Sequence, residues 1–190
     1  MEISSLVLYL IAAPVAFIRL LLLLYKRKYS FFQLVCYFVL FFCITAKIST
    51  DFFPFRIGAL DLPEAELVQC FWVPFSAYIY VIRETPEAVV DLLQAAALAL
   101  VMAYCICMLL TRVRSWKSLL ITMAFLCGSE LLSVVSVLIF KNTVKYVDTG
   151  MFICYAAGAL AGSFIYWIFR DYEENQKRRN LEDDNGFAGQ

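Results

Sequence analysis

The sequence contains no histidine. Because histidine is the commonest general base and the commonest metal ligand, its absence excludes His-based catalytic triads and His-containing metal sites. Charged residues are also scarce, at 17% of the chain, and the 16 basic residues balance the 16 acidic ones. A chain without excess positive charge gives no reason to expect direct binding of nucleic acid. These absences argue against a histidine-dependent enzyme and against a nucleic-acid-binding protein.

The seven cysteines do not form a pattern that predicts a site. Their number is odd, they include no Cys-x-x-Cys pair, and all except Cys70 fall inside apolar runs. Such cysteines are typical of small buried packing residues rather than of disulfide frameworks or metal centres. We therefore expect no cofactor and no metal ion.

Apolar residues are abundant, at 63% of the 190 residues. No soluble domain of this size can cover so much apolar surface, and the apolar runs are long enough to cross a bilayer as helices. The sequence therefore predicts an all-α, polytopic transmembrane helical bundle. Five spans are expected, with four as the alternative if the first run, which contains Pro14 and Arg19, does not cross completely. The expected spans are residues 3–24, 31–48, 92–110, 118–140 and 151–169.

One further apolar segment, residues 68–82, is too short for a comfortable crossing. It contains Pro74 and a high density of aromatic residues, which favour the membrane interface. A crossing here would also move the basic turn at residues 112–117 to the outer side, against the positive-inside rule. We therefore expect residues 68–82 to form an interfacial or re-entrant segment.

The charge pattern predicts the orientation and four parts of the chain. Basic clusters at residues 26–28 and 112–117 mark the cytoplasmic side of a bacterial inner membrane, with an external N-terminus and a cytoplasmic C-terminus. The expected parts are a transmembrane helical hairpin (1–50), an external loop with an interfacial aromatic segment (51–91), a three-span helical core (92–169) and a charged cytoplasmic tail (170–190).

Glu130 stands alone in the middle of the fourth expected span. A carboxyl group at that depth costs about 2.5 to 3.5 kcal/mol on insertion scales, so it needs a partner, a proton or a water-filled cavity. Ser129, Ser133 and Ser136 accompany it and predict an intramembrane polar cluster. Arg19 is either its counter-ion or an arginine that snorkels to the membrane face. The sequence indicates no second carboxylate within reach of Glu130.

Small residues recur every fourth position at the start of the fifth expected span: Gly150, Cys154, Gly158 and Gly162. This small-xxx-small ridge is typical of a helix-packing face. It is available to receive either the 118–140 helix or another subunit, and we expect a homo-oligomer. The sequence leaves the choice between these partners open.

The C-terminal tail carries acidic and basic residues at helical spacing. Acidic residues precede basic residues by four positions, which predicts that the fifth helix continues beyond the membrane. The tail is either a solubilising, topology-fixing segment or a docking element for a cytosolic partner protein. The candidate docking residues are Glu173, Glu174, Lys177, Arg178 and Arg179.

Several motifs resemble those of the VanZ-like membrane proteins. They are the basic turn at 110–120, Cys127–Leu132 with Glu130, the acidic position Asp148, the glycine-bounded run 158–162 and the upstream segment 53–57. Their order and spacing are similar to that family over about 115 residues (roughly 52–166). The resemblance implies a cell-envelope protein of the glycopeptide (teicoplanin) resistance type.

The chain also departs from that family. Ser133 stands where the family has glutamine after its glutamate, and Tyr155 stands where the family has asparagine before its glycine. In layout alone, a small multi-span protein with a charged cytoplasmic tail is similar to the membrane subunit of the bacterial Kiwa anti-phage system. That likeness implies a role in antiviral defence, together with a cytosolic partner.

Three classes of function follow from these features. An enzyme is disfavoured because no nucleophile, base or metal-ligand set is seen to converge. An oligomeric ion or proton channel would place a ring of Glu130 carboxylates around an axis. We favour a non-catalytic inner-membrane scaffold or sensor, such as the membrane subunit of a bacterial anti-phage system, that couples an envelope perturbation to a cytosolic partner through its tail.

Overall fold

The fold is a bundle of five long helices, which confirms the all-α, five-span prediction. Each helix is long and apolar enough to cross a membrane, including the first, which contains both Pro14 and Arg19. The helices are α1 (Ser5–Tyr25), α2 (Phe31–Phe52), α5 (Ala88–Leu109), α6 (Ser115–Phe140) and α7 (Thr149–Phe187). The computed structural model describes residues 2–25, 30–53, 55–56, 63, 67–76, 78–79, 88–110 and 115–187.

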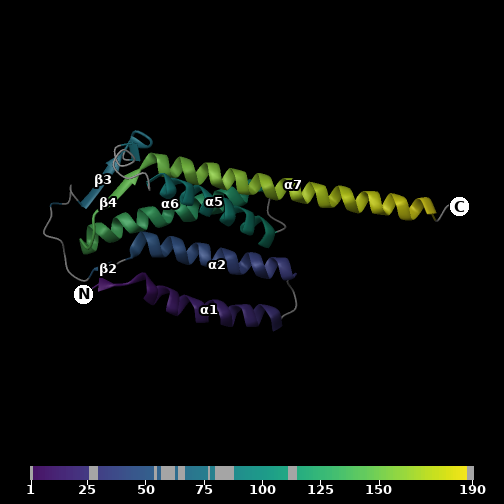
Figure 1. Ribbon diagram of the computed structural model, residues 1–190, viewed down its shortest axis with the longest axis horizontal. Coiled ribbons are helices and arrows are strands. Elements are labelled where there is room, and N and C mark those ends of the chain that lie inside the picture. Colours follow the sequence, from purple (N-terminus) through teal and green to yellow (C-terminus); the bar gives the residue numbers. More distant parts are fainter. Residues whose placement is uncertain are drawn as a thin grey trace.

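The two ends of the bundle differ (Figure 1). The N-terminus and all labelled strands lie at one end, here called the strand end. The C-terminal ends of α1 and α5 and the N-terminal ends of α2 and α6 lie at the opposite end, here called the tail end, and α7 projects from it toward the C-terminus. The two termini are therefore at opposite ends, as an odd number of crossings requires.

Two short strand pairs close the strand end, and the sequence did not predict them. β1 (Glu2–Ile3) pairs antiparallel with β2 (Phe55–Arg56). β3 (Val68–Phe71) pairs parallel with β4 (Lys145–Asp148), so that Val68 lies opposite Lys145. The segment at 68–82 thus begins as a strand, and among its described residues no helix is long enough to cross the membrane.

The tightest helix packing joins α7 to α5. A Cβ atom placed on Gly158 would lie 2.1 Å from the carbonyl oxygen of Ala96, and one placed on Gly162 would lie 2.1 Å from that of Leu100. Only glycine lets the two backbones approach so closely. Gly158 and Gly162 therefore pack against α5 of the same chain, whereas Gly150 faces Phe75. For Gly158 and Gly162 the prediction that the ridge receives the 118–140 helix or another subunit was wrong, because α5 gives them a closer-fitting surface.

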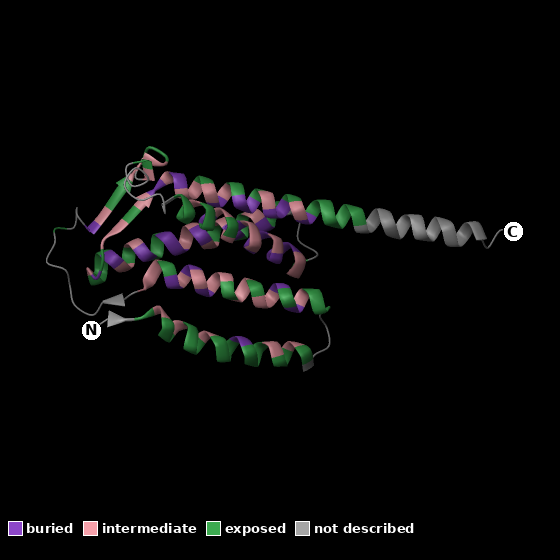
Figure 2. Cartoon of the chain, viewed as in Figure 1, coloured by how far each residue is buried: buried purple, intermediate pink, exposed green. Residues whose placement is uncertain are grey.

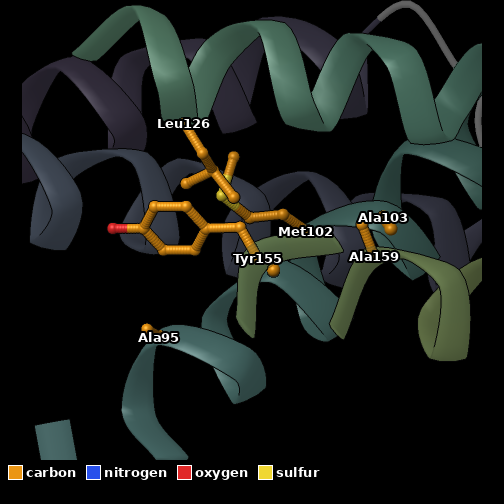
Figure 3. Packing of buried hydrophobic residues seen from close by; sticks show 7 residues of the cluster. Ala95, Met102, Ala103, Leu126, Tyr155 and Ala159 are labelled. Atoms are coloured by element: carbon orange, nitrogen blue, oxygen red, sulfur yellow. The ribbon is translucent and has the colours of Figure 1, made fainter. Parts of the chain in front are cut away.

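The apolar core lies where α5, α6 and α7 meet (Figure 3). The cluster combines small and large side chains and includes Ala95, Met102, Ala103, Leu126, Tyr155 and Ala159. The phenol oxygen of Tyr155 points away from these apolar neighbours. Tyr155 therefore contributes its ring to the core and its hydroxyl group to a polar region next to the core.

The outer surface of the bundle is apolar. Large side chains such as Leu10, Phe17, Leu131 and Phe164 are more than half exposed. Helix α1 packs against α2 and is exposed along most of its length (Figure 2). Because soluble proteins rarely expose apolar patches of this extent, the surface is that of a multi-pass membrane protein.

A pair of glycine substitutions tests the α5–α7 packing. Gly158→Ala should lower the free energy of unfolding by about 1 to 3 kcal/mol, because the new methyl group meets the Ala96 carbonyl oxygen. Gly128→Ala is the matched control, since no atom lies within 4 Å of its Cβ position and alanine favours a helix. Thermal unfolding in detergent micelles measures both. Equal stability of the two variants would contradict the close packing.

Candidate functional site

Glu130 is buried, with 8% of its surface exposed, and it is surrounded by polar partners. One carboxylate oxygen lies 2.5 Å from the ammonium nitrogen of Lys47 on α2, and the other lies 2.8 Å from that of Lys145 on β4. Tyr155 on α7 donates a hydrogen bond of 3.0 Å to the same group. Four elements (α2, α6, β4 and α7) therefore converge on one carboxylate.

A second carboxylate belongs to the same network. Asp51 follows Lys47 by one turn of α2, with 2.8 Å between Oδ1 and the ammonium nitrogen, and the ammonium group of Lys145 lies 3.6 Å from the same oxygen. The side chains of these four residues, which we call the charge quartet, are 4 to 14% exposed. The expectation that Glu130 has no second carboxylate within reach was therefore wrong. Two positive and two negative charges cancel within the quartet.

Three hydroxyl groups form hydrogen bonds with the residues of the quartet. Ser129 donates a hydrogen bond to Asp51, and Lys145 donates one to the hydroxyl oxygen of Ser133. Lys47 donates a 2.7 Å hydrogen bond to the phenol oxygen of Tyr155. Among the described contacts of the quartet, Ser136 takes no part, and it is half-buried one turn further along α6. Ser129 and Ser133 thus lie in a polar cluster with Glu130, as the sequence predicted.

Arg19 does not belong to this cluster. It is exposed on α1, which packs against α2, whereas the ion pairs of Glu130 are made with Lys47 and Lys145. The counter-ion prediction for Arg19 was therefore wrong. The physical reason is the order of the helices: α2 lies between α1 and the core, and α2 itself provides Lys47.

A cavity of about 330 Å³ opens beside the quartet. It lies between α2, α5 and α7, and the segments that follow β3 and form β4 contribute to its wall. Besides the quartet, its lining includes the polar or aromatic residues Thr50, Tyr78, Asp91, Gln94, Tyr146 and Tyr155 and the apolar residues Ala46, Ala95, Leu98 and Met151. Its volume lies within the range of small-molecule sites in proteins.

Tyr78, in the segment after β3, lines the cavity. Its hydroxyl group lies 3.8 Å from the sulfur of Met151. Burial, followed by the negative charge of Asp91, raises the pKa of Tyr78 to about 12. The phenol therefore stays protonated and neutral throughout the physiological pH range.

Asp148 has a separate, structural role. It is buried, and its carboxylate accepts hydrogen bonds from the backbone N–H groups of Phe75, at 2.8 Å, and Gly150, at 2.6 Å. Phe75 has a left-handed backbone (φ 63°), and a Cβ atom on Gly150 would lie 2.7 Å from its nitrogen. Asp148 thus fixes the start of α7 to the segment after β3. Cys154, one turn further along α7, is half-buried.

The tail residues Glu173, Glu174, Lys177, Arg178 and Arg179 lie on α7, which continues without a break to Phe187. The prediction that the fifth helix continues past its apolar span is confirmed, while the side chains of these tail residues lie outside the described residues. The basic clusters at 26–28 and 112–114 lie outside them too. In the part of the chain that is described, no group of three or more Cys, Asp or Glu side chains is placed to hold a metal ion.

Sequence reasoning missed four residues of the site: Lys47, Asp51, Lys145 and Tyr155. One signal was present. Lys47 lies in an apolar run and precedes Asp51 by four residues, and an ionisable residue inside a span indicates a functional or structural partner. Lys145 and Tyr155 gave no such signal, because a loop lysine and a core tyrosine are ordinary.

No model of a protein family, no curated protein and no solved structure matches the chain. The VanZ-like resemblance and the likeness in layout to the Kiwa membrane subunit therefore stay predictions. Two positions of the VanZ-like motifs are nevertheless placed. Glu130 lies in the quartet and Asp148 at the start of α7.

Because the charges of the quartet balance, removal of one of them should destabilise the protein. Lys47→Met should lower the free energy of unfolding by about 3 to 5 kcal/mol, because two buried carboxylates would then share one lysine. The double variant Lys47→Met/Glu130→Gln leaves Lys145 and Asp51 as a neutral pair, so it should be less destabilised than the sum of the two single variants.

The control for this series is Lys117→Met, which removes an exposed lysine from the other end of α6 and should change the stability little. Thermal unfolding in detergent micelles measures all four variants. Strict additivity of the two single changes would show that Lys47 and Glu130 are not coupled.

Proposed function

We propose that the protein is a non-catalytic scaffold and sensor of the bacterial inner membrane. In this proposal the charge quartet responds to a change at the strand end, and α7 carries the response to a cytosolic partner at the tail. The observation that supports it is the continuity of α7. One helix of 39 residues, about 58 Å long, begins at the quartet and ends well beyond the bundle.

The quartet has the properties of a two-state element. Each lysine contacts both carboxylates, so a small displacement of α2 against α6 exchanges one pairing for another without leaving a charge uncompensated. Tyr155 connects this exchange to α7, because its hydroxyl group contacts both Lys47 and Glu130. Conformational signalling requires an element that has two distinct packed arrangements.

The orientation follows from the charges. In the proposed topology the strand end faces outward and the tail end faces the cytoplasm, since in the sequence the basic cluster 26–28 joins α1 to α2 and the cluster 112–117 joins α5 to α6, and these helix ends lie at the tail end. The charged stretch 173–179 is then presented to cytosolic proteins. We propose that the protein forms a homo-oligomer in the bilayer and binds one such partner.

Two roles in the cell are compatible with this mechanism. The likeness in layout to the Kiwa membrane subunit favours anti-phage defence, with the envelope perturbation caused by infection as the stimulus. The alternative, based on the VanZ-like motifs, is a cell-envelope role in glycopeptide (teicoplanin) resistance. Deletion of the gene distinguishes them, because it should raise phage plating efficiency in the first case and teicoplanin sensitivity in the second.

An ion or proton channel receives less support from the geometry. A carboxylate ring requires Glu130 to face an axis shared by several subunits. The carboxylate of Glu130 instead points into its own chain, where it is held by Lys47 and Lys145. Ion flux in proteoliposomes that Glu130→Gln abolishes would reverse this preference.

Breaking the helix between the quartet and the tail should uncouple them. With a photo-crosslinking residue at position 176, wild-type protein should crosslink to a cytosolic partner, and Lys47→Met should change the yield at least twofold. Insertion of four glycines between Arg170 and Asp171 should keep the crosslink but remove its dependence on Lys47, because glycine interrupts helices. Insertion of four alanines keeps the helix continuous and should preserve the dependence.

Deletion of residues 173–190, which also removes the crosslinking position 176, should abolish copurification of the partner and leave membrane insertion intact. The crosslink yields and the partner are identified by mass spectrometry. A yield that is the same with and without Lys47→Met would contradict signalling through α7. Copurification that survives the deletion would contradict docking at the tail.

A further inference from the structure

The described residues that line the cavity beside the charge quartet carry a net negative charge. They include two lysines and three acidic residues, Asp51, Asp91 and Glu130, so the sum of their formal charges is −1. The quartet is neutral, and the excess charge belongs to Asp91, which is exposed at the mouth in the first turn of α5. Among the described residues no ion pair with Asp91 is present. A negative cavity attracts cations and repels anions.

Three aromatic rings contribute to the cavity wall. Tyr78, Tyr146 and Tyr155 all line the cavity, and the negative charge of Asp91 acts on Tyr78. The Lys47 nitrogen lies 2.7 Å from the phenol oxygen of Tyr155 and 5.1 Å from the ring centroid, so this ammonium group contacts the hydroxyl edge of the ring. Aromatic faces combined with a carboxylate are the usual recognition elements for organic ammonium groups.

Most of the remaining wall is apolar, with Thr50 and Gln94 as its polar members. Ala95, Leu98 and Met151 line the cavity between the mouth and the core. These side chains cannot solvate a small inorganic cation, but they can contact the carbon chain of an amine. An anion would have to displace Asp51 or Glu130 from both lysines, whereas an ammonium group finds Asp91 available.

We propose that this cavity is a binding site for an organic ammonium group carried on a short apolar stem. The ammonium group binds between Asp91 and the rings of Tyr78 and Tyr146, and the stem contacts Leu98 and Met151. This class of ligand has two possible sources, the amine headgroup of a lipid and a soluble amine. Both reach the site, because Asp51 is next to the last residue of α2 and Asp91 is near the first residue of α5, at the end of the bundle.

This inference rests on the proposed function only for its consequence in the cell. An ammonium group in the cavity adds a positive charge beside Asp51 and Glu130 and weakens their hold on Lys47 and Lys145. Re-pairing of the quartet then reaches α7 through Tyr155. Binding itself is measured on the purified full-length protein, without the cytosolic partner.

Isothermal titration calorimetry tests the site on the full-length protein in nanodiscs of a neutral, amine-free galactolipid. The probe is n-butylammonium, and butanol and butyrate are the matched neutral and anionic compounds. We expect saturable binding of n-butylammonium only. Asp91→Asn should weaken it about tenfold, as expected for the loss of one charge-assisted contact. Asp171→Asn, which removes an exposed carboxylate at the tail end, should leave it unchanged.

A second variant tests the aromatic contribution. Tyr146 is 62% exposed, so Tyr146→Leu should fold normally, and it should weaken the binding of n-butylammonium about threefold. Thermal unfolding of each variant verifies its folding. Absence of saturable binding, equal binding of butanol or butyrate, or unchanged affinity in Asp91→Asn would overturn the proposal.

Nanodiscs that contain phosphatidylethanolamine identify the source of the ligand. If the lipid headgroup occupies the site, this lipid should compete and lower the apparent affinity for n-butylammonium. If the affinity is unchanged, the site takes a soluble amine, and the site itself still stands. Failure of binding leaves the crosslinking result at position 176 unaffected, so the two proposals fail independently.

Discussion

The ammonium group of Lys47, buried between the carboxylates of Asp51 and Glu130, is the contact on which the strand end of the bundle depends. Three charges in a low-dielectric interior are stable only when each is paired, so α2 and α6 must hold a fixed register. The second lysine, Lys145, is supplied by β4, and the parallel pairing of β4 with β3 keeps that strand in place. The β3–β4 sheet therefore helps to hold Lys145 where it pairs with the buried carboxylates.

The glycine ridge of α7 supplies the second constraint. Gly158 and Gly162 bring α7 against the backbone of α5, and this packing fixes the position of Tyr155 one turn earlier on α7. Tyr155 then joins apolar core and charge quartet, with its ring in the first and its hydroxyl group in the second. Because α5 is held so closely to α7 while α2 approaches them through side chains, space is left between the three helices. That space is the cavity.

The sequence predicted the helices themselves better than it predicted which helices pack against one another. Runs of apolar residues revealed the five spans, since length and hydropathy are local properties. That Glu130 needs a partner could also be predicted. Whether the partner is Lys47 or Arg19 depends on which helix lies next to α6. The sequence indicates how deep a residue lies in the membrane, but not which helices are neighbours. The glycine ridge was recognised, yet its partner α5 was not, for the same reason. The β3–β4 pair joins segments more than seventy residues apart and left no local pattern.

A buried salt-bridge network is weak evidence for stability, because well-packed apolar residues often serve as well or better. The quartet therefore requires another explanation, and its surroundings supply one. A network that only fixed the fold would be expected to lie sealed within the core, whereas this one faces a cavity that opens at the mouth marked by Asp91. It also contacts, through Tyr155, the one helix that leaves the bundle. These two features, the open cavity and the contact with α7, are the basis on which we propose a role in signalling rather than in assembly alone.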